Sequence, residues 1–301
     1  MAAAYDIVSE ELAEVAAPLV EIAARPAAVV IGKPTPTNLA LADAFGALGY
    51  GGSVAAPASA LSLGEADLAL ARLDVLPTLD GTEAGLWRLP FAVRDGGRLL
   101  NEPNALLAAH DKLRTALVLG RAGVPHPRTL HVRSGRSADF EPPYVVKPRF
   151  GSWGCDVFLC ETRRDLAVRL DELRGRAWFR RQGALVQELV EPTGSDLRIV
   201  VAGGRVIGAV ERLAPQSEWR TNVALGATRR RIYASPSARA IALAAVAAVG
   251  LDLAGVDLLP DPRGGFVVLE VNGAVDFTTD YADDVFAAAA GALAEAARDH
   301  S

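Results

Sequence analysis

The stretch AGVDLLPDPRGGFVVLEVNG, residues 254–273, decides the fold. Two apolar runs flank a Gly-Gly turn, which predicts two antiparallel strands. On such strands Asp257 can lie beside Glu270, and Glu270 shares a face with Asn272, two positions further on. Two carboxylates and an amide carbonyl are hard oxygen ligands, which favours a Mg²⁺ site that also holds nucleotide phosphates. Surface polarity is the alternative, but the flanking residues are strongly apolar, and charges inside such strands usually have a partner.

Lysine is rare in this chain. Of 31 basic residues, only Lys33, Lys112 and Lys147 are lysines. An ammonium group is a compact point charge and a guanidinium is a planar fork, so a lysine in such a chain marks a position that suits the compact charge. Lys112 follows His-Asp, and Lys147 ends an apolar run just before a Gly-rich turn. Both placements indicate cations held against phosphate oxygens.

The Gly-rich turn is the segment Gly151-Ser152-Trp153-Gly154. Its glycines let backbone N–H groups approach anionic oxygens, which is typical of a flexible phosphate loop. No Gly-Lys-Ser/Thr follows, so it is not a P-loop, and the chain has no Gly-x-Gly-x-x-Gly at a strand–helix junction, which argues against a nicotinamide dehydrogenase. An ordinary hairpin turn is the alternative.

Two further segments carry polar residues in suggestive positions. In residues 187–198 a strand end, a Gly turn and a returning strand form a cleft wall that offers backbone groups to a purine, with Asp196 and Arg198 on one strand face. Arg220 and Asn222 flank a predicted loop, where a fork-shaped donor suits a carboxylate or a phosphate. A solvated loop is the alternative for this last pair.

Composition limits the class of protein. The chain has 301 residues, of which 50% are hydrophobic and 22% charged, so we expect a globular protein of two or three subdomains. A net charge of −5 argues against a nucleic-acid coat protein. The arginine clusters 163–164, 180–181 and 229–231 are expected to be mainly solvated surface, with local anion sites as the alternative.

The chain also shows features of a cytoplasmic protein. Cys155 and Cys160 are five positions apart, so on a strand they face opposite sides and a disulfide between them is not expected. The N-terminal residues lack a signal-peptide pattern. The apolar stretch 240–259 contains Asp252 and Asp257, so we expect a helix, a turn and a strand there rather than a membrane span.

Periodicity predicts the order of elements. An Ala-rich helix at 8–24, a strand at 29–32, a helix at 38–50 with Asn38 as its N-cap and a strand at 67–74 indicate a small parallel α/β domain. A helix is predicted next, at 104–123. An α+β lid at 125–190 follows, with strands at 129–132, 144–147, 156–160 and 184–190 and a helix at 165–175. The last part has predicted strands at 196–201, 205–211, 255–259 and 265–271 and helices at 237–249 and 284–298. Lys33, Arg72 and Asp74 lie at predicted strand ends and are candidate substrate contacts, although structural or solvent-facing roles are favoured.

Taken in order, these segments resemble the ATP-grasp superfamily, specifically its RimK-type and LysX-type branch of carboxylate–amine ligases. The resemblance runs from about residue 101 to the C-terminus and rests on His110-Asp-Lys112, Val-Val-Lys147-Pro with Gly-Ser-Trp-Gly, Gln-Glu-Leu-Val190, Ser-Asp196-Leu-Arg198, Trp-Arg220-Thr-Asn222, Ala-Gly-Val-Asp257 and Leu-Glu270-Val-Asn272. It implies an α/β and α+β multidomain protein with an ATP-grasp fold. The expected domains are a small α/β (pre-ATP-grasp) domain at 1–103, a lid subdomain at 104–186 and a metal-binding subdomain at 187–301.

The resemblance also implies roles for residues. The nucleotide phosphates would be bound by Lys112, by Lys147 and by the loop of Gly151, Ser152 and Trp153. Adenine would be contacted by backbone groups of Glu188 and Val190. The ribose would be reached by Asp196. Asp257, Glu270 and Asn272 would bind the metal, and Arg198, Arg220 and Asn222 would act on the transferred phosphoryl group. Related chains often have Ser-Pro-Gly after Glu-Val-Asn, whereas this chain has Gly273-Ala-Val-Asp276, so the resemblance does not give the substrates.

The expected activity is an ATP- and Mg²⁺-dependent ligation, with Mn²⁺ as an alternative ion. A carboxylate attacks ATP to give an acyl phosphate and ADP, and an amine then displaces phosphate to form an amide. The expected partners are a small carboxylate and a small amine, such as amino acids, with a peptide or carrier protein as a further option, in a homo-oligomer with no nucleic acid or membrane. The alternatives are an ATP-dependent phosphotransferase acting on a small molecule and a non-catalytic ATP-binding module.

Overall fold

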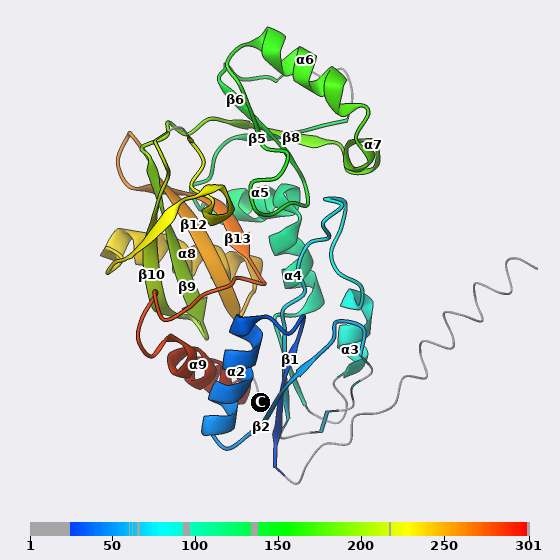
Figure 1. Ribbon diagram of the computed structural model, residues 1–301, viewed down its shortest axis with the longest axis vertical. Helices are drawn as coiled ribbons and strands as arrows, with labels where there is room; N and C mark the ends of the chain where they lie inside the picture. The colour runs from blue at the N-terminus through cyan, green and yellow to red at the C-terminus, as the bar shows by residue number, and fades with distance from the viewer. Residues whose placement is uncertain are drawn as a thin grey trace, which may run out of the picture.

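The computed structural model describes residues 25–59, 61, 63–64, 67–92, 97–133, 138–216 and 218–299. Three sheets carry the fold, and Figure 1 shows them as a parallel sheet at the bottom, a large sheet on the left and a lid sheet at the top. The predicted helix at 8–24 lies outside the described residues. Within those residues, the helices are too short or too polar to span a bilayer.

The N-terminal sheet has the strand order β2-β1-β3-β4, and its pairings are all parallel. Its elements are β1 (Ala27–Ile31), α2 (Pro36–Ala47), β2 (Gly51–Ala55), β3 (Leu68–Ala71), η1 (Leu86–Arg88), α3 (Leu89–Ala92) and β4 (Arg98–Leu100). The predicted N-cap was wrong: Thr35 caps α2, because its hydroxyl accepts a hydrogen bond from the Asn38 N–H. The predicted strand at 67–74 is shorter, so Arg72 and Asp74 follow β3.

The predicted helix at 104–123 is two helices, α4 (Pro103–His110) and α5 (Lys112–Arg121). Asp111 separates them with extended backbone angles of φ −83° and ψ 96°. Its carboxylate accepts a hydrogen bond from Leu113 N–H and pairs with Arg149. The break therefore places Lys112 in the first turn of a new helix, with its N–H bonded to the Arg149 carbonyl at 3.1 Å.

The lid is an antiparallel sheet of order β5-β8-β6-β7 covered by two helices. Its elements are β5 (Thr129–Val132), β6 (Tyr144–Pro148), β7 (Phe158–Cys160), α6 (Arg163–Leu173), α7 (Ala177–Gln182) and β8 (Ala184–Glu188). A capping box between Thr162 and Asp165 starts α6. β8 crosses the predicted domain boundary at 186, yet it pairs along its length within this sheet.

The large sheet is antiparallel, with the order β11-β10-β9-β12-β13. Its elements are β9 (Ser195–Ala202), β10 (Arg205–Leu213), η2 (Val223–Leu225), β11 (Thr228–Arg231), α8 (Pro236–Val249), β12 (Leu253–Pro260), β13 (Phe266–Asn272) and α9 (Val285–Asp299). Apolar side chains of one face, such as Ile199 and Val256, pack with α8 in the main core. The opposite face carries the charged residues described below.

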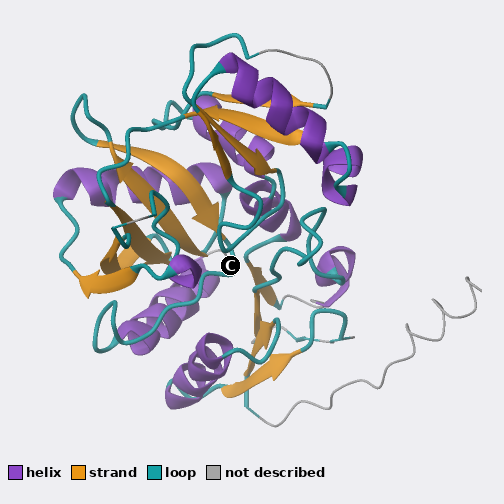
Figure 2. Cartoon of the chain, turned by 45° about the horizontal axis from the view of Figure 1, so that its top comes forward, coloured by secondary structure: helices purple, strands orange, loops and turns teal. Residues whose placement is uncertain are grey.

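Buried polar contacts join the N-terminal sheet to the large sheet, which lie side by side in Figure 2. Asn101 is fully buried, and its side chain bonds the backbone of Asp252, Leu253 and Gly273. Arg72 donates to the Val275 carbonyl at 2.6 Å. These contacts fix the loop after β13 against the ends of the parallel strands. Cys155 and Cys160 are free thiols, as predicted.

Candidate active site

The predicted site residues gather around two adjoining cavities between the lid and the charged face of the large sheet. The first, about 990 Å³ including its open mouth, is lined by Lys112, Lys147, Gly151, Ser152, Trp153, Glu188, Val190, Asp196, Arg220, Asn222, Asp257 and Glu270. The second, about 710 Å³, is lined by Arg198 and Asn272. Ser152, Trp153, Arg212, Asn222 and Glu270 line both cavities, so the two are neighbours.

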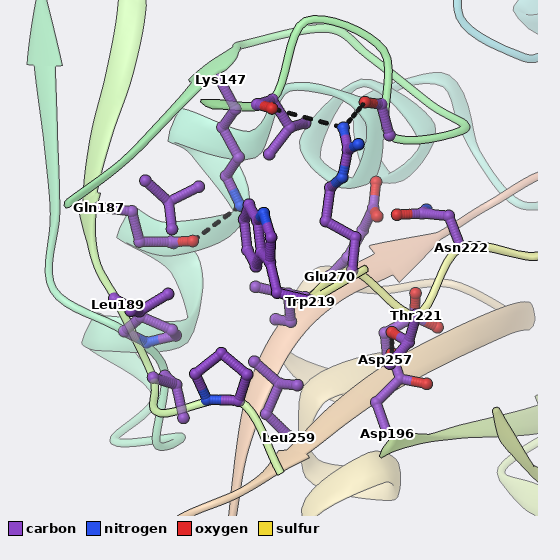
Figure 3. A pocket seen from close by; sticks show the side chains of 18 of the residues that line it. Lys147, Gln187, Leu189, Asp196, Trp219, Thr221, Asn222, Asp257, Leu259 and Glu270 are labelled. Carbon is purple, nitrogen blue, oxygen red and sulfur yellow. Dashed lines mark hydrogen bonds between the residues drawn. The ribbon is translucent and has the colours of Figure 1, made fainter. Parts of the chain in front are cut away.

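The two predicted phosphate lysines lie in the same cavity but have different partners. Lys112 Nζ lies 2.7 Å from Glu270 Oε1. Lys147 is buried and donates to the neutral Gln187 Oε1 at 2.8 Å, a bond visible in Figure 3. Burial, aided by the charge of Lys112, lowers the pKa of Lys147 to about 8. A buried ammonium that is bonded to a neutral amide is poised to gain from an anion.

The predicted metal ligands share one face of the large sheet. Asp257 pairs directly with Glu270 across β12 and β13, and Asn272 follows on the same face. The donor set suits Mg²⁺, because it offers two carboxylates and an amide oxygen. The Asn272 Nδ2 atom is buried and has no hydrogen-bond partner among the described residues. In the described part of the chain, no three His, Cys, Asp or Glu side chains cluster as a metal site.

Arg212, which is not among the residues predicted from the sequence, is the centre of a buried charge network. Its guanidinium donates to Asp196 Oδ1 at 2.7 Å and to Asp257 Oδ2 at 2.9 Å. Arg198 donates to both Asp257 oxygens at 2.7 Å. Thr221 donates to Asp196 at 2.6 Å. Asp196 is predicted to bind a ribose hydroxyl. That hydroxyl would compete with Arg212 and Thr221 for the Asp196 carboxylate.

A β-bulge explains why Arg212 was missed. The Gly203-Gly204 turn pairs Ala202 with Arg205, and continuing that register would place Glu211 opposite Asp196. The register shifts by one residue between Val206 and Gly208, so Arg212 faces Asp196 instead. A strand register counted from the turn therefore pairs Asp196 with Glu211, and only the bulge brings Arg212 opposite Asp196.

The Gly-rich turn is tied to the loop that carries Arg220. Arg220 Nη1 donates to the Gly154 carbonyl at 3.0 Å, while its Nη2 donates to Glu218 at 2.7 Å. Gly154 has φ +74°, and a Cβ there would come within 2.8 Å of Asn222 Oδ1. Only glycine therefore allows the two loops to approach this closely. Arg220 thus ties the turn to the loop on the other side of the first cavity.

Part of the wall of the first cavity suits a planar base. Glu188 and Val190 line it, together with the apolar side chains of Leu189 and Leu259 and the indole of Trp219. The Glu188 N–H is bonded to the Arg128 carbonyl at 2.9 Å. Apolar and aromatic walls with a few polar groups are typical of small-molecule sites.

Residues 109–295 match the family model described as the RimK-like ATP-grasp domain. The chain belongs to this family. A probable alpha-L-glutamate ligase of Serratia proteamaculans (strain 568) is 39% identical over 184 residues, which cover 59% of this chain and 60% of that protein. A probable alpha-L-glutamate ligase of Thioalkalivibrio sulfidiphilus (strain HL-EbGR7) is 38% identical over 180 residues, 58% of each protein. The match thus spans about three fifths of these relatives.

Solved structures of ATP-grasp proteins share the fold over most of the chain. D-cycloserine synthetase DcsG has a TM-score of 0.68 at 22% identity and covers 90% of this chain and 99% of its own. The D-alanine–D-alanine ligase of Bacillus anthracis has a TM-score of 0.63 at 15% identity, covering 92% and 98%. The fold is therefore ATP-grasp, and the likeness includes the N-terminal sheet, which the sequence resembled only in outline.

In this ATP-grasp chain, the three N-terminal candidates have different surroundings. Asp74 lines the second cavity. Arg72 is buried and fixed by Asn38 and the Val275 carbonyl, which is a structural role. Lys33 pairs with Glu83, and it is not one of the described residues that line the two cavities.

Proposed function

We propose that the protein is an ATP- and Mg²⁺-dependent ligase that joins a carboxylate to an amine. The observation that carries this proposal is the shared cavity of Lys112, Lys147, Asp257 and Glu270. Two ammonium groups and two carboxylates around one space suit a triphosphate held from one side by cations and from the other through a divalent ion.

The chemistry needs positioning more than reactive side chains. A carboxylate oxygen attacks the γ-phosphorus, the bond to the β-phosphate oxygen breaks, and ADP leaves. The amine nitrogen then attacks the acyl carbon, loses a proton, and phosphate leaves as the carbon–oxygen bond breaks. Neither step requires a covalent enzyme intermediate, so the side chains act by holding the reactants and compensating charge.

The predicted site residues have different proposed roles in the two cavities. Lys147 and Lys112 bind phosphate oxygens, and the turn at 151–154, held by Arg220, covers them. Asn222 lines both cavities and Arg198 lines the second, where the phosphoryl group would meet the carboxylate. Asp257, Glu270 and Asn272 would hold Mg²⁺. When bound, this ion neutralises phosphate charge and orients the nucleotide.

The ligase proposal gives specific substrates to test. The relatives are named probable alpha-L-glutamate ligases, so L-glutamate is the first candidate. The ATP-grasp ligase PsnB has been solved in complex with a precursor peptide, so peptides form a second class. A screen of ADP release against amino acids and short acidic peptides, followed by mass analysis, should reveal an amide product. A cytoplasmic homo-oligomer remains a prediction.

The same screen separates the ligase from its two alternatives. A phosphotransferase would release ADP and leave a stable phosphorylated small molecule without an amide. A non-catalytic module would bind ATP and release no ADP with any substrate. Either result would overturn the ligase proposal, whereas an amide formed with one ADP per bond supports it.

A further inference from the structure

A hairpin of residues 74–83 follows β3 and reaches from the N-terminal sheet to the lid. Its two arms meet in an antiparallel bridge between Val75 and Thr82. The Leu76 N–H donates to the Gly81 carbonyl at 2.8 Å, which closes the tip. In Figure 1 this segment, in cyan, rises from the N-terminal sheet toward the lid. The 74–83 hairpin is therefore held by its own hydrogen bonds and presents its tip to another part of the molecule.

The tip of the hairpin inserts Leu79 into the core of the lid. Leu79 is 9% exposed and belongs to a buried cluster that includes Phe140 and Val186. The other buried residues described in this cluster all lie in the lid, between positions 132 and 186. Leu79 has φ +60°, a left-handed conformation that costs free energy for a residue with a Cβ. Such a conformation persists only where its surroundings hold it, and here the lid core surrounds the side chain.

Polar contacts fix the same tip to α7 of the lid. Asp80 forms an ion pair with Arg181, and the Asp80 carbonyl accepts a hydrogen bond from Gln182 Nε2 at 3.1 Å. The Asp80 side chain is only 7% exposed, and the Thr78 hydroxyl donates to its Oδ1 at 2.6 Å. Hydrogen bonds from Thr78 and Arg181 hold the pKa of Asp80 below its usual value, so this carboxylate is ionised at neutral pH. Arg181, expected to be mainly solvated, thus joins the lid to the N-terminal part of the chain.

The hairpin and α7 lie against the two ends of the Gly-rich turn. A Cβ on Gly151 would lie 3.9 Å from Leu79 Cδ2, so Leu79 is close to the start of the turn. Just after the turn, Asp156 accepts a hydrogen bond at 2.7 Å from Nε1 of Trp178, which belongs to α7. The hairpin thus braces the start of the turn directly, and it braces the end through the helix that it holds.

We infer that Leu79 and Asp80 are positioning residues for the nucleotide, because they hold the lid and the Gly-rich turn in the arrangement that retains it. This inference rests on the nucleotide site of the proposed function. Neither residue is among the described residues that line the first cavity, so both act through the lid. The apparent affinity for a nucleotide is proportional to the fraction of molecules in the binding arrangement. Loosening the tip of the hairpin therefore weakens nucleotide binding and speeds nucleotide release.

The rate of ADP release measures this role without any ligation. A fluorescent ADP analogue is bound with Mg²⁺ and displaced by excess ADP in a stopped-flow experiment. Leu79→Ala removes the side chain that fills the lid core, and it should raise the dissociation rate by about 10-fold or more. Asp80→Asn keeps the acceptor for Thr78 and removes only the charge, so it should raise the rate by about 2- to 5-fold. High salt should remove the difference between Asp80→Asn and wild type, because Arg181 is 69% exposed and its ion pair is screened.

Two control variants separate positioning from a general loss of stability. Leu166 is buried in the same cluster but belongs to α6. Leu166→Ala should lower the free energy of unfolding and leave the rate of ADP release within about twofold of wild type. Arg180 precedes Arg181 on α7 but donates to the backbone carbonyls of residues 174 and 175. Arg180→Gln should therefore release ADP at the wild-type rate, whereas Arg181→Gln should match Asp80→Asn.

The outcomes separate this inference from the ligase proposal. If Leu79→Ala and Asp80→Asn release ADP at the wild-type rate, the positioning role is wrong and the ligase remains. Equal acceleration in Leu166→Ala would also overturn the positioning role, because the effect would then come from lid stability. If wild type forms no amide but Leu79→Ala and Asp80→Asn alone speed release, the ligase proposal fails and the positioning role stands. If wild type binds no nucleotide, both proposals are wrong.

Discussion

Arg212 Nη2 lies 2.9 Å from Asp257 Oδ2 within the charged face of the large sheet. Burial alone would raise the pKa of Asp257, but Arg198 and Arg212 hold it at about 2. Asp257 therefore stays ionised at neutral pH, as a metal ligand must be. The same guanidinium holds Asp196, so one buried side chain positions two predicted site residues.

Replacement of Arg212 by Met should destabilise the fold strongly. Asp196 and Asp257 would remain buried without this partner, and breaking a buried pair from one side costs about 3–5 kcal/mol. Chemical denaturation measures the free energy of unfolding. Arg230→Met is the control, because it removes an arginine of β11 whose ion pair lies at the exposed surface. This variant should change the free energy of unfolding by less than about 1 kcal/mol. Equal stabilities for the two variants would show that the network is not held by Arg212.

Replacement of Lys147 by Met should stabilise the nucleotide-free protein and abolish ATP binding. Burial has lowered the pKa of Lys147 from 10.5 to about 8, so removal of the charge should raise the free energy of unfolding by about 1–3 kcal/mol at pH 7. Lys112→Met is the matched control, because it leaves Glu270 without its ion pair and should not stabilise. Denaturation and calorimetric titration with ATP test both effects. Normal ATP affinity in Lys147→Met would contradict the phosphate role.

ATP binding should take up a proton above pH 8. In the free protein Lys147 loses its proton as the pH rises through its lowered pKa of about 8. Phosphate contact favours the charged form and raises this pKa again, so binding at pH 8.5 restores the proton and affinity falls as pH rises further. Titration calorimetry in buffers of different ionisation enthalpy measures the uptake. Any ATP that Lys147→Met still binds should be bound without proton uptake. Equal proton uptake by wild type and Lys147→Met would show that another group takes up the proton.

The lowered pKa also predicts how stability changes with pH. Between about 8 and 10.5 the unfolded chain binds more protons at Lys147 than the folded chain does. Stability without nucleotide should therefore receive a contribution from Lys147 that rises with pH over this window. The difference in unfolding free energy between Lys147→Met and wild type should shrink accordingly, and a constant difference would argue against a depressed pKa.

Glu270→Gln should abolish Mg²⁺-dependent ADP release while the protein stays folded. The amide removes one of two carboxylates from the proposed ligand set, so turnover should fall by at least about 100-fold. Glu211→Gln, on β10 and paired with Arg230, is the matched control and should keep full activity. Steady-state ADP release at several Mg²⁺ concentrations tests this. Unchanged turnover in Glu270→Gln would remove the metal assignment.

Local patterns in the sequence predicted the strand pair of residues 254–273 and the alignment of Asp257 with Glu270, which the register confirms. A turn and two apolar runs suffice for this, because strand alternation is a local property. The rarity of lysine and the placement of Lys112 and Lys147 predicted that both lie against phosphate oxygens, and the structure brings both to one cavity.

Features set by tertiary contacts could not be predicted in this way. The break at Asp111 depends on Arg149, which is distant in sequence, and periodicity alone therefore gave one long helix. Arg212 reaches Asp196 only because of the bulge between Val206 and Gly208. The second cavity is lined by Asp74, which follows β3, and by residues of the large sheet such as Arg229, and no local motif marks these residues as its lining.

Transfer of oxygen-18 from the carboxylate to phosphate tests the acyl phosphate most directly. The best carboxylate from the substrate screen is labelled in its carboxyl oxygens and incubated with the amine, ATP and Mg²⁺. The account predicts that each amide formed releases inorganic phosphate carrying one labelled oxygen, because that oxygen bridges carbon and phosphorus before the amine attacks. Unlabelled phosphate accompanying the amide, or label found only in a stable phosphorylated product, would contradict it.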